Sequence, residues 1–295
     1  MKRARLAEYE WMVKYTPQKE WIEGRGVFLC LAFFFSEIGA GIYFVSLLLD
    51  FKGGWIAGWL VTLVLGGMIH LGFLGHPLRA WRILLKPASS ELSRGLWFIL
   101  FFGGIGFLQV LPVLFEGLPW TGEAPAVKTL MGVLSVLIII HGFLTMNVVR
   151  ALPFWNSSMI IPLSLASGIW VGAQAAEFMM KVSGHELYLP ELWSRWSLLG
   201  YVALLAMYLW GTYHSSDNAK ESVKRLLIGG SALRFYIGVV GVGIMIPLII
   251  TISVWTGGVE ILGQGTLFTR FLCVTIGDLT VRYSIMKEAI YTPLL

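Results

Sequence analysis

A small set of ionisable and amide side chains lies inside long apolar stretches of this sequence. A charge or an imidazole in such surroundings loses its hydration, so each one is a candidate for chemistry. Imidazole can both accept and donate a proton near neutral pH, and carboxyl groups can relay protons. The set comprises Glu37, His70, Gln109, His141, Asn147, Gln174, Glu177, Asp278 and Arg282.

Purely structural roles are open for several of these residues. His141 could hydrogen-bond to the backbone of a neighbouring helix, and Glu37 could be a protonated carboxyl bonded to a helix partner. Asp278 and Arg282 are four residues apart. That spacing favours an intrahelical ion pair over a proton relay.

Metal and haem chemistry are not indicated. His70 and His141 could face each other, but a membrane b-type cytochrome usually needs four histidine ligands, and only five histidines are present. Cys30 and Cys273 form no CxxC pattern, and zinc spacing, a Walker motif and a Ser-His-Asp arrangement are missing from the sequence. We therefore expect no metal, haem or disulfide in this chain.

The composition indicates that membrane helices carry these residues. The 295 residues are 57% hydrophobic and 13% charged, with a mean hydropathy of +0.75. Soluble domains carry about 25% charged residues. A crossing needs about 20 apolar residues. Eight stretches qualify: 27–49, 55–75, 95–115, 127–149, 158–180, 196–214, 231–256 and 266–288.

We therefore predict an all-α polytopic membrane protein with eight transmembrane helices. Small-residue clusters at 36–41 and 164–168 begin similarly in the first and fifth stretches and would allow close helix approach. This similarity favours two four-helix bundles, 27–149 and 150–295, after an N-terminal segment, 1–26.

The distribution of basic residues predicts the orientation. The side of the membrane that holds both chain ends has 17 Lys and Arg residues and the other side has 5. The positive-inside rule then places both termini in the cytoplasm. The first twenty residues do not form a signal peptide, so the first helix is expected to direct insertion. The net charge of +5 is interpreted as a topology signal, and no nucleic-acid partner is expected.

Polar residues gather near the side that holds the termini. His141 and Asn147 are ~9 Å apart along their helix, and His70 lies within two turns of the same surface. A quinone, with a polar ring and an isoprenoid tail, would suit this region. We expect His141 to be the acid–base group, with His70, Glu37, Asn147 and Arg79 as further quinone contacts.

The remaining polar residues suggest two other roles. Glu37, Gln174, Glu177 and Asp278 form a sparse trail across the membrane that could carry protons. Arg79, Arg82 and Arg150 could dock a partner subunit. For the basic loop 79–94, a role as a topology determinant is the alternative.

Several segments resemble the NrfD and polysulfide-reductase membrane-subunit family, which includes PsrC-like and DmsC-related proteins. The resemblance covers most of the chain. Its strongest part is similar to the family's "T-G-x-L … x-P-x-W-N … P … S-G" pattern. The matching segments are His141-Gly142-Phe143-Leu144, Ala151-Leu152-Pro153-Phe154-Trp155-Asn156, Pro162, Ser167-Gly168, Leu74-Gly75-His76-Pro77-Leu78-Arg79-Ala80-Trp81-Arg82, Glu91-Leu92-Ser93-Arg94-Gly95-Leu96-Trp97, Gly39-Ala40-Gly41 and Arg282-Tyr283.

The resemblance implies eight helices in two bundles, without haem, in a prokaryotic inner membrane. It implies electron exchange between menaquinone or ubiquinone and a docked ferredoxin-like iron–sulfur subunit, which serves a molybdopterin-type catalytic subunit. His141 occupies the position of a quinone-contacting tyrosine. Phe28 and Ala32 replace a polar pair, so Glu37 or His70 is expected to substitute. Known members dock partners on the outer face, where their termini also lie. Either this complex faces the cytoplasm, which the charge count favours, or the basic surface reflects docking of a partner.

Two functions from other classes are alternatives. A secondary transporter would use helices broken near the midplane at corresponding places in two repeats. Pro112, Pro162 and Pro247 do not occupy corresponding places in the two halves. A structural membrane anchor without redox activity is the third possibility.

Overall fold

The computed structural model describes residues 15–292 except 116, 119 and 121, so residues 1–14 of the predicted N-terminal segment 1–26 lie outside the described part. Each predicted stretch corresponds to one long helix. Two of these are composite helices with a central π-helical segment. The long helices are α2 (Gly26–Leu48), α3–η2–α4 (Lys52–Leu60, Val61–Gly67, Met68–Phe73), α5 (Glu91–Leu114), α6 (Pro125–Asn147), α7 (Ile160–Val182), α8 (Tyr188–Tyr213), α10–η4–α11 (Ala232–Arg234, Phe235–Met245, Ile246–Gly257) and α12 (Gln264–Lys287).

Short elements connect or follow the long helices. They are β1 (Thr16–Pro17), the 3₁₀ helix η3 (Pro77–Leu85), α9 (Asp217–Leu227), the 3₁₀ turn η5 (Val259–Ile261) and β2 (Ile290–Tyr291). The largest departure from the predicted boundaries is at α8, which begins at Tyr188 and not at 196. Proline often marks the end of a helix, but Pro190 lies in the first turn of α8, where proline is tolerated.

Six helices of the described residues are long and apolar enough to cross a membrane: α2, α3–α4, α5, α6, α8 and α10–α11. This finding supports the predicted all-α membrane class. The helices α7 and α12 have similar lengths, 23 and 24 residues, but are not among the six. Both carry charged residues that are buried against other helices, which lowers their hydropathy. Eight crossings therefore remain a prediction.

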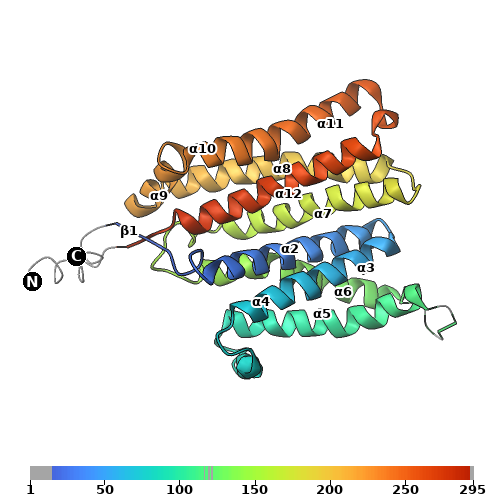
Figure 1. The fold of residues 1–295 in the computed structure, drawn as a ribbon, viewed down its shortest axis with the longest axis horizontal. Helices are drawn as coiled ribbons and strands as arrows, with labels where there is room; N and C mark the ends of the chain where they lie inside the picture. Colours follow the sequence, from blue (N-terminus) through green and yellow to red (C-terminus); the bar gives the residue numbers. More distant parts are fainter. Residues whose placement is uncertain (1–14, 116, 119, 121, 293–295) are drawn as a thin grey trace, which may run out of the picture.

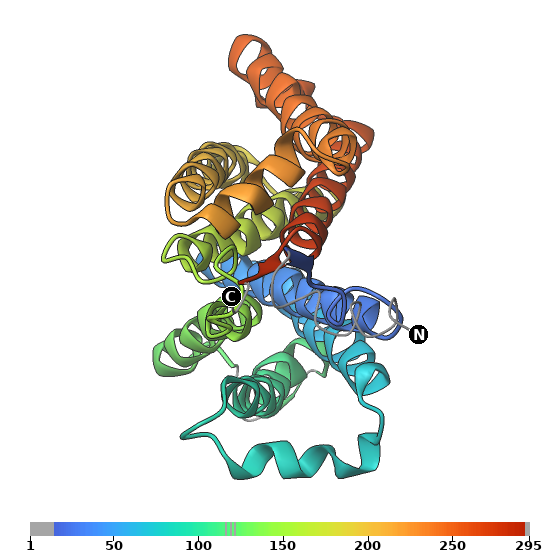
Figure 2. The ribbon, with the colours of Figure 1, turned by 90° about the vertical axis from the view of Figure 1, so that its left-hand side faces the viewer.

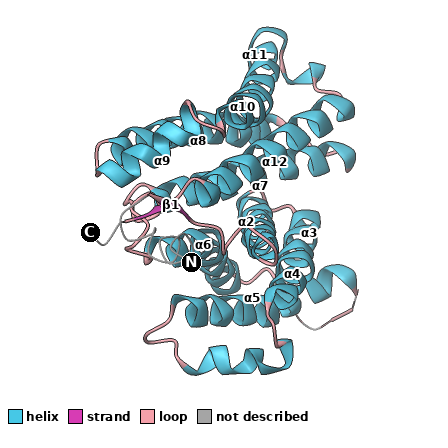
Figure 3. Ribbon diagram, turned by 60° about the vertical axis from the view of Figure 1, so that its left-hand side comes forward, coloured by secondary structure: helices cyan, strands magenta, loops and turns pink. Residues whose placement is uncertain are grey.

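The two ends of the described chain meet. β1 pairs antiparallel with β2, with Thr16 opposite Tyr291 (Figure 3). The backbone N–H of Gln18 donates to the Ala289 carbonyl at 2.8 Å. We call this end of the molecule the terminal face; Figure 2 looks onto it. The prediction that both ends lie on the same side is confirmed for the described residues.

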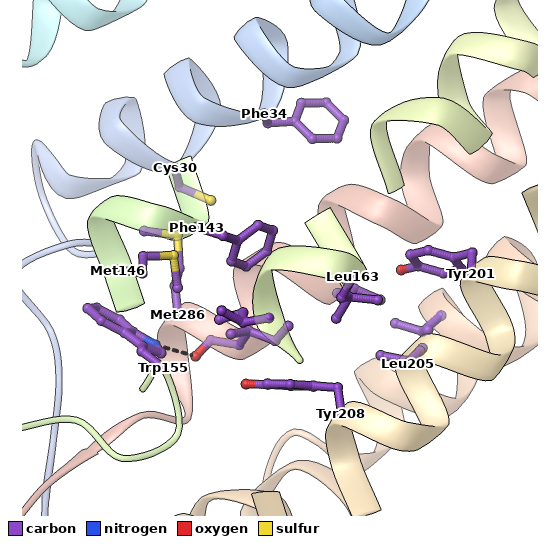
Figure 4. Packing of buried hydrophobic residues seen from close by; sticks show 14 of the residues in the cluster. Cys30, Phe34, Phe143, Met146, Trp155, Leu163, Tyr201, Leu205, Tyr208 and Met286 are labelled. Carbon is purple, nitrogen blue, oxygen red and sulfur yellow. Dashed lines mark hydrogen bonds between the residues drawn. The ribbon is translucent and has the colours of Figure 1, made fainter. Parts of the chain in front are cut away.

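The helices form two groups that share a core. Figure 1 shows α2, α3–α4, α5 and α6 on one side, with α7, α8, α11 and α12 on the other. The largest cluster of buried hydrophobic residues crosses between the groups and includes Phe34, Phe143, Leu163 and Tyr201 (Figure 4). The indole of Trp155 donates to the Ile285 carbonyl at 2.9 Å and so fixes the α6–α7 loop to α12. The division into two four-helix bundles remains a prediction.

Glycines allow α2 and α7 to approach at backbone distance. A Cβ on Gly41 would lie 2.0 Å from the carbonyl oxygen of Gly168, and a Cβ on Gly172 would lie 2.4 Å from the carbonyl carbon of Gly41. No side chain could occupy either position without moving a helix. The small-residue clusters thus have the packing role that the sequence predicts.

We predict that Gly41→Ala lowers the free energy of unfolding by at least about 1–3 kcal/mol, because two rigid backbones must separate. The matched control is Gly200→Ala in α8, where no atom lies within 4 Å of the added Cβ. Since alanine favours helix more than glycine, this control should be neutral or slightly stabilising. Thermal unfolding in detergent would measure both, and equal midpoints would contradict the prediction.

Candidate functional site

A cavity of about 340 Å³ lies near the terminal face, between α2, α4, η3, α5 and α6. Its wall is apolar except for His70 and His141. Apolar lining residues include Leu29, Leu63, Met68, Leu71, Leu96 and Ile99. The structure therefore brings together two of the residues that the sequence analysis selected, in a space that suits an apolar ligand with a polar end.

The imidazole of His141 packs directly on the backbone of α5. A Cβ on Gly95 would lie 1.8 Å from His141 Nε2, so only glycine leaves room for the ring. His141 is buried, and its Nδ1 has no hydrogen-bond partner within the described part of the chain. The expected alternative, a bond to a neighbouring helix backbone, is not formed by that nitrogen. An unpaired buried nitrogen is free to bond a ligand.

Phe33 of α2 joins the two histidines into one wall. Its ring centroid lies 5.2 Å from that of His70 and 6.1 Å from that of His141, and both contacts are edge-on. Phe98 makes a similar edge contact with His141, at 6.4 Å. These aromatic contacts limit the rotation of both imidazoles, which would hold them in a defined direction toward the cavity.

The cavity reaches the lipid-facing surface between α4 and α5. Met68, Leu71 and Leu100 line it and are also exposed on the outside of the molecule. A long apolar chain could therefore extend from the cavity into the bilayer without crossing a polar surface.

Three other predicted quinone contacts do not line this cavity. Glu37 lies deeper in the interior, in contact with α7 and α12. Asn147 Nδ2 donates to the Ser157 carbonyl at 2.8 Å and so stabilises the α6–α7 loop. Arg79 is exposed on η3. Their roles at a quinone are not supported by position and remain predictions.

A buried polar cluster joins α2, α7 and α12. Arg282 forms an ion pair with Glu37, and Ser164 Oγ donates to the same carboxylate at 3.2 Å. Asp278 accepts a hydrogen bond of 2.5 Å from Ser167 Oγ. The expected intrahelical pair between Asp278 and Arg282 is therefore wrong. Arg282 reaches across to α2 because glycines bring α2 close to its neighbours.

A second buried cluster lies nearer the opposite face. Arg270 of α12 forms an ion pair with Glu177 of α7, and Ser194 Oγ donates to that carboxylate at 2.5 Å. Gln174 Nε2 donates to the Ser194 carbonyl at 3.4 Å. Arg270 is one of the five basic residues that the charge count assigns to the side opposite the termini, but the structure buries it. Arg270 lies 8 residues before Asp278 and 12 before Arg282, a spacing that does not define one narrow helix face, so no pattern in the sequence indicates its interior position.

Aromatic rings separate the two clusters along α7. Gln174 follows Ser167 by seven positions, which is ~10 Å along a helix. Between them, Trp170 stacks on Tyr201 with centroids 4.4 Å apart, and the Tyr201 hydroxyl is buried without a hydrogen-bond partner in the described structure. Glu37 Oε1, Glu177 Oε1 and Asp278 Oδ2 are equally unpaired, and buried atoms of this kind normally bind ordered water.

The predicted docking residues are all exposed but lie in two places. Arg150 lies in the loop after α6. The carbonyl of the next residue, Ala151, accepts a hydrogen bond of 2.9 Å from the backbone N–H of Thr292, which follows β2. Arg150 is therefore close to the paired strands. Arg79 and Arg82 lie on η3, at the outer edge of the terminal face (Figure 2). A partner subunit that contacts all three arginines would have to extend across the terminal face.

Comparison with known proteins supports the family resemblance. The chain is 26% identical over 261 residues to Protein NrfD of Escherichia coli (strain K12), and the match covers 75% of this chain and 80% of the relative. No family model matches the chain.

We predict that Glu37→Gln lowers the free energy of unfolding by about 3–5 kcal/mol, since it leaves the buried Arg282 guanidinium without its carboxylate partner. The double variant Glu37→Gln/Arg282→Met should recover part of that loss, because it removes the uncompensated charge. The control, Glu221→Gln, breaks a half-exposed surface pair with Arg225 and should cost about 0.5 kcal/mol or less. Unfolding in detergent would measure all three. Equal effects of Glu37→Gln and Glu221→Gln would refute the structural role of the buried pair.

Proposed function

The similarity to Protein NrfD supports membership of this chain in the NrfD family, and on that premise we propose that it is the quinone-reactive membrane subunit of a respiratory oxidoreductase. In this proposal all eight long helices cross a prokaryotic inner membrane. The subunit exchanges electrons between menaquinone or ubiquinone and a docked ferredoxin-like iron–sulfur subunit. That partner serves a molybdopterin-type catalytic subunit.

The observation that carries the proposal is the position of His141 in the cavity. The cavity offers a polar end at His141 and His70, an apolar wall, and an opening to lipid between α4 and α5. A quinone needs each of these features, since its carbonyl oxygens require polar partners and its isoprenoid tail requires an apolar path.

The chemistry assigned to the histidines is proton transfer at the quinone oxygens. Oxidation of a quinol releases two protons and two electrons. His141 would accept the proton of one hydroxyl and His70 the proton of the other, while the two electrons would leave one at a time for the partner's iron–sulfur clusters. The reverse direction would use the same groups. The position of both histidines in the lining of one cavity supports this pairing with one ring. A positioned acid–base group typically contributes 10²- to 10⁴-fold in rate.

The terminal face is the proposed docking surface for the partner. The cavity lies near this face, so a cluster docked there would have a short path to the quinone. Arg150, exposed beside the paired strands, is the best placed of the predicted docking residues. Arg270 and Arg282 are buried, so they do not act as surface charges. When these two arginines are left out of the count of Lys and Arg, the side that holds the termini still has the larger number. The positive-inside rule therefore still favours cytoplasmic termini.

We propose a proton path separate from the quinone cavity. Glu37 and Asp278 belong to the first buried cluster and Gln174 and Glu177 to the second, which is closer to the opposite face. Unpaired oxygens on both clusters could bind the water that connects them. The path would make the enzyme electrogenic.

The transporter alternative gains no support from the structure. The π-helical segments η2 and η4 lie in the second and seventh long helices. Two four-helix repeats would pair the second helix with the sixth, so these irregular segments do not occupy corresponding positions.

We predict that His141→Ala reduces quinone turnover by at least about 100-fold, because the acid–base group is lost. The iron–sulfur subunit should still co-purify, because His141 is buried whereas the proposed docking residues are exposed. Turnover would be measured with the assembled complex in detergent. Retained turnover would refute the role of His141, and a complex without any iron–sulfur subunit would refute the redox assignment and leave a transporter or a structural anchor.

Two glycine variants in α5 distinguish an effect on the position of the His141 ring from a general effect on the helix. Gly95→Ala adds a methyl group where the imidazole packs and should lower turnover by displacing the ring. Gly104→Ala lies on the same helix with no atom within 4 Å of the added Cβ and should leave turnover unchanged.

For the proton path, we predict that Glu177→Gln abolishes or strongly reduces proton movement across proteoliposomes while quinone turnover persists, because Glu177 does not line the cavity. The conservative variant Glu177→Asp should retain part of the proton movement. An internal pH dye would record it. Proton movement that is equal in Glu177→Gln and the native complex would contradict the path.

A further inference from the structure

The helix η3 presents an unusual apolar surface to the outside. It has nine residues and begins at Pro77, with three residues between it and the end of α4. Leu78 is 93% exposed, Leu85 65% and Trp81 58%. Soluble surfaces rarely leave several large apolar side chains of one short helix uncovered, so this face is expected to have a partner.

The other face of η3 is part of the cavity that contains His141. Ala80 and Ile83 line that cavity. The indole of Trp97 in α5 donates to the Leu84 carbonyl at 3.1 Å. After η3, Arg94 donates to the carbonyls of Pro87 and Ala88 at 2.8 and 2.9 Å. The helix is therefore fixed to α5 and forms a wall of the cavity.

The place of η3 in the fold corresponds to the membrane interface. It connects the end of α4 with the start of α5, and both belong to helices apolar enough to span a membrane. In Figure 2 it runs along the lower edge of the terminal face, across the direction of the long helices, away from the paired strands. Exposed apolar side chains of Met68, Leu71 and Leu92 lie on the adjoining helices. This location is that of an interfacial amphipathic helix.

The charges around η3 are of one sign. Arg79 and Arg82 are exposed on it, Lys86 follows it, and no acidic residue occurs from 74 to 90. The Arg82 guanidinium carbon lies 5.7 Å from the centroid of the Trp81 ring. Tryptophan is typical of the headgroup layer, and arginine bonds phosphate oxygens through two N–H groups at once.

We propose that the outer face of η3 lies in the headgroup layer and binds anionic phospholipid. Leu78, Trp81 and Leu85 enter the acyl boundary, and Arg79 and Arg82 hold the lipid phosphate. This assigns Arg79 and Arg82 to lipid and leaves Arg150 for partner docking. Because η3 also forms a wall of the cavity that contains His141, a bound lipid would stabilise the entrance to that cavity. This consequence rests on the proposed quinone function, whereas the lipid binding itself does not.

The first test locates Trp81 in the bilayer. The full chain is reconstituted in vesicles of phosphatidylcholine with about 30% phosphatidylglycerol, and its fluorescence is quenched by phosphatidylcholine with brominated acyl chains. Subtraction of Trp81→Phe isolates the signal of Trp81. We expect this difference signal to be quenched, and the difference for Trp170→Phe, which removes a fully buried indole, to be unquenched. Quenching of Trp81 by aqueous acrylamide but not by brominated lipid would overturn the proposal.

The second test measures the headgroup preference by competition between phosphatidylglycerol and phosphatidylcholine in native mass spectrometry. Arg79→Gln/Arg82→Gln should lower the preference for phosphatidylglycerol by about 30-fold, as expected for two basic residues near a membrane surface. The control Arg150→Gln should not change it. An unchanged lipid preference in the double variant would overturn the proposal. If the double variant also lost the iron–sulfur subunit while its lipid preference stayed intact, η3 would instead be a protein-docking surface. Quinone turnover of the His141 series is independent of both results.

Discussion

The ion pair between Arg282 and Glu37 connects the last long helix to the first. Both side chains are almost completely buried, and a charge in such a site requires a partner of opposite sign. The pair forms because glycines let the backbones of α2 and α7 approach closely, with α12 packed beside them. With the first and last long helices joined in this way, β1 and β2 meet at one face and the two helix groups share a core.

This arrangement keeps two kinds of site apart. The cavity with His70 and His141 is apolar and opens toward lipid, as a ligand with an isoprenoid tail requires. The ion pairs at Glu37 and Glu177 lie between α2, α7, α8 and α12, away from that cavity. If charges lined the cavity, they would bind water and raise the free energy of a tail within it. Separate locations would allow the proposed acid–base chemistry at a quinone, together with charge pairing in the interior, within one fold.

The approximate positions of the long helices could be predicted from apolar stretches of the sequence, because hydropathy adds up along the chain and does not depend on neighbours. Helix boundaries were less predictable: the apolar stretch begins at 196, whereas α8 begins at Tyr188 and includes Pro190 in its first turn. The two long helices that are not among the six apolar enough to span a membrane, α7 and α12, were also correctly located. The partners of their charges were not, since the expected Asp278–Arg282 contact is replaced by Arg282–Glu37 and Asp278–Ser167.

The sequence by itself determined the helical membrane class, the shared side of the chain ends and the selection of His141, His70, Glu37 and Glu177 as residues of interest. Each follows from the type of a residue and its local surroundings. Only the tertiary structure decided that His70 and His141 share one cavity, that Gly95 makes room for the imidazole and that Arg270 is an interior residue. These facts depend on how far each helix is rotated and how closely it approaches its neighbours. Packing between helices sets both quantities, and no local pattern along the chain encodes them.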